Sequence, residues 1–356
     1  MPKVIVGMSG GVDSAVAAYL LKVAGYDVIG VTLKIWYAAD GKESRCCEID
    51  DAQKVSALLG IPYYAINHVA DFRKWVTEPF IESYIHGLTP NPCIGCNRYI
   101  KWDGMLSAAH DLGADHIATG HYAQIVQLEN GRYSVKQSLH PEKDQTYMLY
   151  MLTQEQLKAT IMPLGKLTKD EVRNMAKAAG LPVAEKPDSQ EICFVPDGSY
   201  AEFIEENYTG EIPSKGNFVD EDGNILGQHS GIINYTVGQR RGLGIALGYP
   251  AFVKRIDAER NEVVIGTDEQ LYSRTVICGN VNYMGAVPLS GDEKLRCRTK
   301  IRYHHSAAVS TIERIDDNTI RIVFDEPVRA AAPGQSAVFY DDDMCVLGGG
   351  MILSAE

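Results

Sequence analysis

The chain has 356 residues, more than one ordinary hydrophobic core accommodates, so its length predicts two or three domains. A composition of 45% hydrophobic and 22% charged residues is typical of globular proteins and excludes a disordered or fibrous chain. The net charge of −12 argues against a nucleic-acid coat spread over the whole molecule and leaves open only a local basic patch.

The sequence shows no membrane or secretory signal. No apolar run approaches the roughly 18 residues of a membrane span, and the apolar stretch before Ser9 is too short for the core of a signal peptide. We therefore expect a cytoplasmic protein that does not engage a membrane. In the cytosol, clustered cysteines serve catalysis or metal binding more often than structural disulfides. The eight cysteines stand at positions 46, 47, 93, 96, 193, 278, 297 and 345.

The first half of the chain alternates short β-branched runs with helical patterns. Strands are predicted over 4–8, 28–33, 63–67 and 116–119. Helices are predicted over 14–24, 50–59, 71–86 and 101–112, each closed by a glycine, at 25, 60, 87 and 113. This alternation predicts an α/β fold with a doubly wound parallel sheet, whose ligands bind outside the carboxyl ends of its strands.

The pattern changes along the second half. Residues 151–181 are again predicted helical, with Thr168 and Glu171 placed for a capping box. After about residue 208, glycine-rich turns separate short strands over 217–219, 252–256 and 262–265. More regular strands over 275–280, 294–303, 307–315, 319–324, 336–340 and 345–352 predict a small barrel or sandwich. We predict a catalytic domain over 1–207, a small mostly-β central domain over 208–272 and a C-terminal β-barrel over 273–356.

A glycine turn joins the first predicted strand to the first predicted helix. Residues 9–14 read Ser-Gly-Gly-Val-Asp-Ser. Two adjacent glycines let backbone N–H groups converge, and the helix adds the positive end of its dipole, so the turn suits a pyrophosphate. The segment lacks the ending of the Walker loop and the spacing of the dinucleotide motif. An ordinary capped turn is the plainer alternative.

The turn is similar to the signature of the PP-loop ATP pyrophosphatases, which split ATP into AMP and pyrophosphate while adenylating an oxygen. Five further segments resemble those of the tRNA-specific 2-thiouridylases, in the family's order and along essentially the whole chain. They are Thr-Pro-Asn-Pro-Cys-Ile-Gly-Cys-Asn at 89–97, Ala-Thr-Gly-His-Tyr-Ala at 118–123, Lys-Asp-Gln-Thr-Tyr at 143–147, Ile-Cys-Phe at 192–194 and Thr-Val-Gly-Gln-Arg-Arg-Gly at 236–242.

The resemblance implies a set of contacts for ATP and for the target base. The implied ATP-binding residues are Gly7, Met8, Ser9, Gly10, Gly11, Val12, Asp13, Ser14, Leu33 and Gly120. Asn91, Pro92 and Cys93 match the region that meets the target base. The resemblance places Leu33 and Gly120 on the adenine side of the nucleotide, and both fall at strand carboxyl ends, where an open sheet binds its ligands. We expect Mg²⁺ to accompany the phosphates, with Asp13 as a candidate ligand directly or through water.

Two cysteines carry the predicted chemistry. Cys96 is predicted at the start of a helix with Arg98 and Lys101 close by, and both the helix dipole and the cations favour the nucleophilic thiolate. Sequence spacing alone does not place Cys193 beside it. The resemblance does, because it implies that Cys96 is the catalytic nucleophile and that Cys193 carries a persulfide. The persulfide sulfur attacks the adenylated carbon, and the other cysteine then opens the S–S bond and leaves a disulfide.

Cys93 departs from the family, which usually has Asp at this position. A thiol is a much poorer charged partner than a carboxylate, since its reference pKa is about 8.5. Cys93, Cys96 and Cys193 together also form a three-thiolate set that suits a 4Fe-4S cluster with one open iron, which is the alternative source of sulfur. A zinc ligand or a redox bystander is the remaining reading of Cys93. Cys46 and Cys47 are expected in a helix-entry segment, and Cys278, Cys297 and Cys345 in the core.

One predicted strand carries a basic stripe. Cations stand at every second position from 294 to 302, namely Lys294, Arg296, Arg298, Lys300 and Arg302. On a strand these side chains share one face, and they form the clearest candidate phosphate track in an acidic chain. Tyr303 follows and is suited to stacking on a base. A solvated outer face of a barrel strand is the plainer alternative.

The resemblance adds further tRNA contacts. It implies them for Arg302 and Tyr303 and also for His121, Lys143, Asp144, Gln145 and Gln335. Arg240 and Arg241, in the glycine turn of the central domain, are candidates for phosphate contacts. His121 taken alone is an ordinary hydrogen-bonded loop histidine.

These observations predict an enzyme that uses ATP to replace the 2-oxygen of a wobble-position tRNA uridine with sulfur, releasing AMP and pyrophosphate. Its expected partners are tRNA and a cysteine desulfurase or a sulfur-carrier protein. A PP-loop synthetase that forms an amide on a small molecule is one rival, but it needs neither the cysteine pair nor the basic strand. A redox-sensing RNA-binding protein without ATP chemistry is the other, and the intact glycine turn argues against it.

Overall fold

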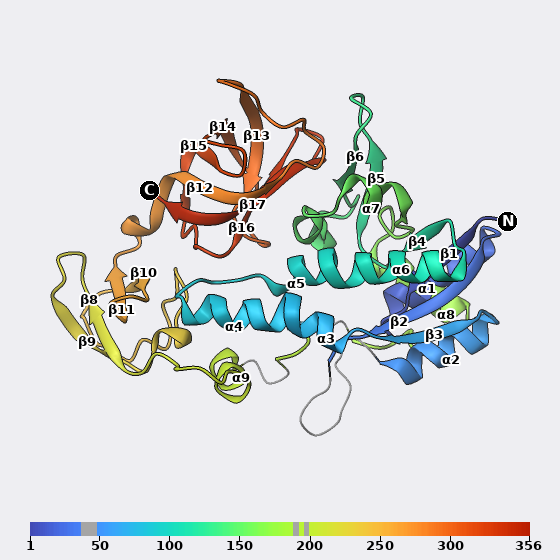
Figure 1. Cartoon of the computed structure of the whole chain (residues 1–356), viewed down its shortest axis with the longest axis horizontal. Helices are drawn as coiled ribbons and strands as arrows, with labels where there is room; N and C mark the ends of the chain where they lie inside the picture. Colours follow the sequence, from blue (N-terminus) through green and yellow to red (C-terminus); the bar gives the residue numbers. More distant parts are fainter. Residues whose placement is uncertain (37–47, 188–191, 196–198) are drawn as a thin grey trace.

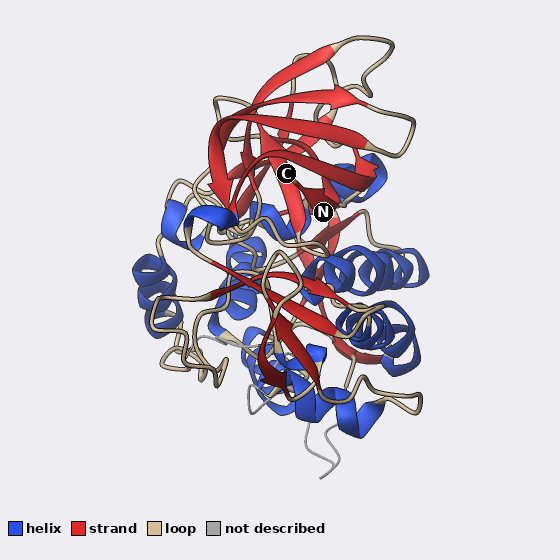
Figure 2. Ribbon diagram, turned by 90° about the vertical axis from the view of Figure 1, so that its left-hand side faces the viewer, coloured by secondary structure: helices blue, strands red, loops and turns tan. Residues whose placement is uncertain are grey.

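The computed structural model describes residues 1–36, 48–187, 192–195 and 199–356. Figure 1 shows three parts: a sheet flanked by helices around the N-terminus, a smaller group of strands β8–β11, and a β-barrel that contains the C-terminus. Figure 2 shows the barrel above the helix-flanked sheet. No helix among these residues is long and apolar enough to cross a membrane.

A five-stranded parallel sheet forms the N-terminal part. Its strands lie in the order β3-β2-β1-β4-β7, with β1 at Lys3–Gly7, β2 at Asp27–Lys34, β3 at Tyr63–Asn67, β4 at His116–Ala118 and β7 at Thr160–Ile161. The chain winds outward from β1 in one direction to β3 and then in the other through β4 to β7. The crevice between β1 and β4 is therefore the expected ligand site of this sheet.

Helices cover both faces of this sheet and bury its apolar side chains. Helices α1 (Val12–Val23), α2 (Ile49–Leu59) and α8 (Lys169–Ala178) share one core with the sheet, and α6 (Asp103–Leu112) contributes to the core of the other face. Gly60 and Gly113 end α2 and α6 in the left-handed conformation that glycine tolerates. The doubly wound α/β sheet predicted from the sequence is confirmed.

Two longer helical stretches precede β4. The first runs through α3 (Val69–Phe72), the π-helix η1 (Arg73–Thr77) and α4 (Glu78–Ile85), and the second through α5 (Pro92–Gly95), the π-helix η2 (Cys96–Trp102) and α6. The rings of Trp75 and Tyr99 stack at 4.6 Å and join the two π-helical segments. Wide turns of this kind are often found at functional sites.

Smaller elements follow β4. The hairpin β5–β6 (Ala123–Gln127 and Tyr133–Gln137) leads through the 3₁₀ turns η3 (Pro141–Lys143) and η4 (Thr146–Leu149) to α7 (Gln154–Ala159), and α9 (Tyr200–Asn207) closes the N-terminal part. The helix predicted over 151–181 is wrong in its middle, where β7 adds an edge strand to the sheet. The capping box of Thr168 and Glu171 at the start of α8 is confirmed.

Two β-structures complete the chain. A four-stranded sheet has the order β10-β11-β8-β9, from β8 (Gly216–Val219), β9 (Ile225–His229), β10 (Phe252–Asp257) and β11 (Glu262–Gly266), and is accompanied by the short turns η5 (Ile232–Asn234) and η6 (Glu269–Leu271). The closed barrel has the order β12-β15-β14-β13-β16-β17. Its strands are β12 (Tyr272–Asn282), β13 (Lys294–Lys300), β14 (Ala308–Arg314), β15 (Ile320–Arg329), β16 (Ser336–Tyr340) and β17 (Val346–Ala355). The predicted C-terminal barrel is confirmed.

The barrel packs directly on the N-terminal part. Val338, Tyr340 and Val346 of the barrel join the same apolar core as Trp102 and Met105 of the second helical stretch. The barrel face that carries β13 and β16 is thereby held close to the loops after β4, and the two parts border a common space.

Candidate active site

The glycine turn after β1 leaves the start of α1 without a side-chain cap. Gly10 has a φ of 78° that favours glycine, and Gly11, the residue just before α1, has no side chain that could cap the first N–H groups of the helix. Ser14 instead turns back into the loop, where its Oγ accepts the Ser9 N–H at 3.1 Å and donates to the Gly11 carbonyl at 3.1 Å. The first N–H groups of α1 are therefore presented together with its positive dipole end.

A cavity of about 870 Å³ opens at this turn. The carboxyl-terminal ends of β1 and β2 contribute to its wall, together with loop residues after β4, Lys169 of α8 and Lys186. Of the predicted ATP-binding residues, Gly7, Met8, Ser9, Gly11, Val12, Asp13, Ser14, Leu33 and Gly120 line it. Gly10 is not among the lining residues and lies against Glu48.

Gly120 permits the closest approach across the crevice. A Cβ at this position would stand 2.7 Å from the backbone nitrogen of Ser14 and 2.7 Å from the carbonyl carbon of Asp13. No flexible side chain relieves a clash with backbone, so only glycine lets the loop after β4 reach the start of α1. Substitution of Gly120 would push apart the two strand ends that border the cavity.

Asp13 is the best-anchored polar side chain of the turn. Its carboxylate accepts two hydrogen bonds of 2.8 Å from Lys169 Nζ and one of 2.7 Å from the Tyr122 hydroxyl. The carboxylate therefore holds Lys169 beside the loop. This arrangement makes Asp13 less available as a direct metal ligand than the sequence alone implied.

The two predicted catalytic cysteines belong to one apolar cluster. Cys96 is buried in it, and Cys193 packs against it, together with the rings of Phe72, Phe80 and Phe194. Ile35 is part of the same cluster and also lines the cavity at the glycine turn. The apolar cluster that holds both cysteines therefore reaches the cavity wall at Ile35.

The helix that carries Cys96 begins earlier than predicted. Pro92 is its first residue, and the Asn91 side chain caps it by accepting the Cys93 N–H at 3.2 Å. Cys93 is therefore nearer than Cys96 to the positive helix end. Of the two cations expected near Cys96, Arg98 pairs with Asp103 at 2.9 Å, and Lys101 lines the cavity.

Among the residues that the structure describes, no three His, Cys, Asp or Glu side chains are grouped so that they could hold a metal ion. Cys93, Cys96 and Cys193 are consequently not assembled as the ligand set of a 4Fe-4S cluster or of zinc. Among the described residues, the placement of these three cysteines does not fit the cluster alternative.

The predicted target-base region faces the barrel. Burial raises the pKa of the Tyr303 hydroxyl, and the nearby Asp144 carboxylate and Cys93 thiol raise it further. Tyr303 and His304 line the cavity at the glycine turn and also a second cavity of about 550 Å³ between the barrel and the loop 141–144. Cys93 thus lies near a ring that borders both spaces.

Three predicted tRNA contacts, His121, Lys143 and Gln145, line the larger cavity. Burial, together with the charge of Lys101, lowers the pKa of His121 to about 3, so the imidazole is neutral at physiological pH. Gln145 holds the loop after β4, because its Oε1 accepts the Tyr122 N–H at 2.9 Å. These residues shape the cavity wall in addition to any contact with RNA.

Asp144 points inward rather than toward solvent. Its carboxylate accepts the Thr146 hydroxyl at 2.7 Å and lies 3.8 Å from Lys300 Nζ. Burial raises the pKa of this carboxyl, while the hydrogen bond from Thr146 and the charge of Lys300 oppose that shift. Lys300 therefore joins the barrel to the N-terminal part.

The basic stripe on β13 alternates as predicted, with Cys297 and Thr299 buried between the cations, of which Lys300 is itself shielded with 13% of its side chain exposed. The strand ends at Lys300, so the predicted extension to 303 is wrong. Lys294 pairs with Glu313 at 2.6 Å, and Arg296 pairs with Asp325, both away from the cavities. Arg298 and Lys300 line the smaller cavity.

The remaining predicted contacts lie elsewhere. Arg302 does not share the stripe, because it donates to the Arg329 carbonyl at 2.7 Å. Gln335 donates to the Thr89 carbonyl at 3.0 Å and so fastens the segment before Asn91 to the barrel. Arg240 and Arg241 are exposed in the central part and line neither cavity.

Cys278, Cys297 and Cys345 are buried, which confirms their prediction as core residues. The predicted helix-entry role of Cys46 and Cys47 falls outside the described residues. Sequence analysis missed Lys169, Lys186 and Glu48 of the cavity wall. Lys169 appears in the sequence only as the residue after the predicted cap Thr168, and Lys186 stands seven positions before Cys193. Neither lysine belongs to a motif that would predict its place in the cavity wall.

Comparison with known families agrees with this architecture. The tRNA methyl transferase HUP domain matches residues 2–197, the tRNA methyl transferase PRC-barrel domain matches residues 201–267, and the aminomethyltransferase β-barrel domain matches residues 273–352. The fold and the cavity at the topological switch of the sheet define a HUP-domain protein with two appended β-structures.

Curated relatives cover the whole chain. A protein of Lachnoclostridium phytofermentans named tRNA-specific 2-thiouridylase MnmA is 53% identical over 99% of this chain and 100% of its own length. A protein of the same name from Acetivibrio thermocellus is 52% identical over 98% of this chain and 99% of its own length. The chain belongs to the MnmA family of tRNA-specific 2-thiouridylases.

Solved structures offer a more distant likeness. The U34-tRNA thiolase NcsA from Methanococcus maripaludis, solved with its 4Fe-4S cluster, matches with a TM-score of 0.36 and 23% identity. The match covers 58% of this chain and 62% of that one. A likeness at this level carries no argument about the chemistry of this chain.

Proposed function

We propose that this chain is an ATP-dependent tRNA-uridine 2-sulfurtransferase. ATP binds at the glycine turn with its phosphates on the start of α1, and the target uridine enters between Cys93 and Tyr303. Family membership supports the substrate class. One structural observation carries the chemistry: Ile35 lines the nucleotide cavity and packs into the cluster that contains Cys96 and Cys193.

The first step is adenylation of the base. The C2 oxygen of the uridine attacks the α-phosphorus of ATP, the bond to the β-phosphate breaks, and pyrophosphate leaves. The N–H groups of α1 and the Lys169 ammonium, which Asp13 holds beside the loop, stabilise the charge that develops on the leaving group. Mg²⁺ enters with the nucleotide as its counter-ion.

The second step delivers sulfur. A persulfide on Cys193 attacks C2 through its terminal sulfur, and AMP departs with the former uridine oxygen. The Cys96 thiolate then attacks the inner sulfur of the persulfide, so the S–S bond breaks, the thiolated uridine is released and a Cys96–Cys193 disulfide forms. A cellular thiol reductant reopens the disulfide, and a cysteine desulfurase or a carrier protein reloads Cys193.

The barrel supplies binding rather than chemistry. Arg298 and Lys300 line the smaller cavity, next to Tyr303, and are suited to an RNA phosphate entering beside the target base. Tyr303 offers a ring for stacking on a nucleobase. We place the anticodon loop of tRNA across this opening between the barrel and the loop 141–144.

Mass spectrometry of tRNA nucleosides tests the proposal. Unmodified tRNA is incubated with ATP, Mg²⁺, a cysteine desulfurase with cysteine, and the protein. We expect 2-thiouridine only when ATP is present. Thiolation that proceeds equally well without ATP, or no thiolation with the fully supplemented protein, would overturn it.

A further inference from the structure

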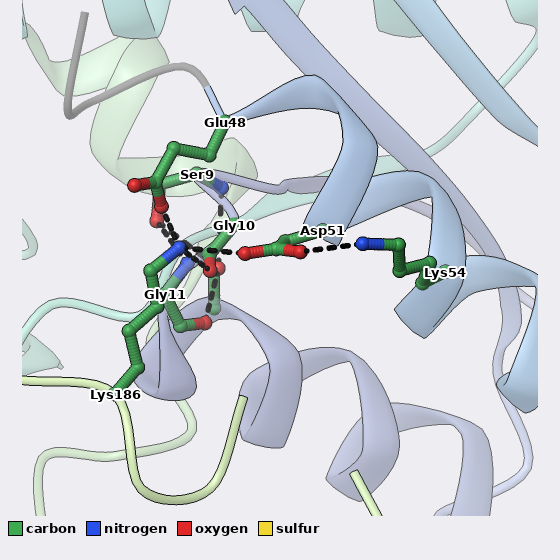
Figure 3. Close-up of polar contacts among 8 residues, drawn as sticks. Ser9, Gly10, Gly11, Glu48, Asp51, Lys54 and Lys186 are labelled. Carbon is green, nitrogen blue, oxygen red and sulfur yellow. Dashed lines mark hydrogen bonds and ion pairs between the residues drawn. The ribbon is translucent and has the colours of Figure 1, made fainter. Parts of the chain in front are cut away.

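Lys186 lies over the glycine turn and is held there by oxygens of the protein itself. Its Nζ donates to the Gly10 carbonyl at 3.2 Å, to Asp51 Oδ2 at 2.8 Å and to the Glu48 carboxylate. Figure 3 shows the two carboxylates and the Gly10 carbonyl converging on this one ammonium. An ammonium has three N–H groups, so all of its donors are in use.

The carboxylates come from the start of α2, which presses on the glycine turn. A Cβ on Gly10 would stand 2.6 Å from the Glu48 carbonyl oxygen and 2.8 Å from Glu48 Cβ. Glu48 precedes α2, and Asp51 lies in its first turn. Lys186 and Glu48 both line the cavity, so this ion pair borders the space where the phosphates are expected.

While Glu48 and Asp51 hold Lys186, their negative charges oppose the binding of a phosphate at the turn. Burial lowers the pKa of Lys186, which means that its charge needs an anionic partner at this position. The partner now present is itself anionic, and it would repel a polyphosphate placed on the turn. A phosphate that enters satisfies the same ammonium, so Lys186 has an anionic partner both before and after the exchange.

The position along the cavity selects the terminal phosphates. Lys186 meets the middle of the turn at Gly10, whereas the walls expected to hold the nucleoside, Leu33 and Gly120, lie at the ends of β2 and β4. A lysine at the loop end of the cavity therefore lies where it can bind pyrophosphate, the leaving group of the adenylation.

We propose that Lys186 binds the pyrophosphate moiety of ATP and that Glu48 and Asp51 hold it in readiness when no nucleotide is bound. This inference rests on the proposed function, because it adds a second cation, beside Lys169, that neutralises the leaving group of that reaction. ATP displaces the two carboxylates from Lys186, and release of pyrophosphate restores the ion pair.

Calorimetric titration with ATP, pyrophosphate and AMP tests the assignment. Lys186→Met is expected to weaken binding of ATP and pyrophosphate about tenfold or more, the loss of a charged hydrogen bond, and to leave AMP binding within about twofold. Lys54→Met is the matched control, because Lys54 pairs with Asp51 at 3.2 Å but does not line the cavity. Lys186→Arg keeps the charge and should retain pyrophosphate binding. It is the variant to measure if Lys186→Met does not fold.

The outcomes separate this inference from the proposed function. Unchanged binding of all three ligands, or an equal loss of all three, in Lys186→Met would overturn the role of Lys186. Failure of the unaltered protein to bind ATP would overturn the proposed function instead.

Removing the negative charge of Glu48, which competes with phosphate for Lys186, should change the affinity for pyrophosphate in the opposite direction. Glu48→Gln is expected to tighten pyrophosphate binding severalfold, with and without Mg²⁺, because the carboxylate that competes for Lys186 is removed. Weaker binding confined to samples with Mg²⁺ would show that Glu48 serves the metal and that the exchange is wrong.

Discussion

The nucleotide cavity and strand β13 both gather charged side chains, but they neutralise them in different surroundings. Lys169 is 13% exposed where it meets Asp13, while Lys294 and Arg296 on β13 are 62% and 55% exposed where they meet carboxylates of neighbouring strands. Exposed ion pairs contribute about 0–1 kcal/mol to stability and are easily exchanged. A shielded pair is costly to break, because the charge that loses its partner stays out of water.

The comparison separates two tasks. In the proposed function, the cavity positions charges that act on a bound anion during the reaction, whereas the barrel strand offers charges that attract and orient RNA. Arg298 and Lys300 lie where the two regions meet, and they line the smaller cavity. Substitutions should therefore damage turnover most at the cavity and affect binding most at the barrel.

The largest effect is expected at Cys96, which lies in the apolar cluster that reaches the cavity wall at Ile35. Cys96→Ser should abolish formation of 2-thiouridine, because a hydroxyl does not attack a persulfide sulfur, while ATP binding persists. Nucleoside mass spectrometry and ATP titration measure the two results. Cys297→Ser is the control, since Cys297 Sγ already lies 3.5 Å from the Ser310 hydroxyl in the barrel core. Retained thiolation in Cys96→Ser would contradict the assignment.

Asp13→Asn should rank next. It removes the anionic partner of Lys169, and kcat/KM for ATP should fall about 10- to 100-fold, the range for charged hydrogen bonds. Steady-state release of pyrophosphate measures this loss. Asp27→Asn, at the exposed start of β2, should behave like the unaltered protein. Equal activity of the Asp13 and Asp27 variants would remove the distinction between shielded and exposed charges.

Two arginine variants of β13 test whether this barrel strand binds tRNA. Arg298→Ala should weaken tRNA binding several-fold and lower the slope of log K against log salt by about 1, because one phosphate contact is lost. Arg296→Ala should change neither quantity, since Arg296 pairs with Asp325 away from both cavities. Filter binding over a salt series checks both variants. Identical slopes in the two variants would place the RNA elsewhere.

The smallest effect concerns stability against acid. The pKa of His121 lies at about 3 in the folded protein, below its ordinary value of 6.5. Between these values the unfolded chain binds a proton that the folded chain does not, so stability falls as the pH drops below 6.5. His121→Gln should reduce this loss by on the order of 1 kcal/mol.

Denaturant unfolding between about pH 4 and pH 7 measures the change. His110→Gln, which replaces a histidine with 90% of its side chain exposed, is the control and should keep the full acid sensitivity. An acid limb that is equally steep in both variants would show that His121 is not the group responsible.

Local patterns predicted much of the architecture. The β-branched runs and the glycine ends located the strands around β1 to β4, and the alternation in β13 placed Cys297 and Thr299 in the barrel core. The hairpin β5–β6 was missed, and β7 was absorbed into a predicted helix, because a strand of two residues has no periodicity to detect.

The site residues were predictable only where they are contiguous in the sequence. The glycine turn is contiguous, so its residues were found, but the partners of Asp13 and Gly10 come from residues 156 and 176 positions away. Lys294 and Arg296 carried a clear pattern, yet the carboxylates that occupy them belong to other strands. Charge pairing is set by the tertiary fold, and that is why the sequence overestimated the free phosphate track.

The most direct test of the account follows the oxygen that leaves the uridine. A tRNA carrying a heavy-oxygen label at C2 of the wobble uridine is thiolated in a single turnover, and the nucleotide products are analysed by mass spectrometry. The account predicts that the label is recovered in the phosphate of AMP, because adenylation precedes the attack of sulfur. Recovery of the label in water or in pyrophosphate, with unlabelled AMP, would contradict it.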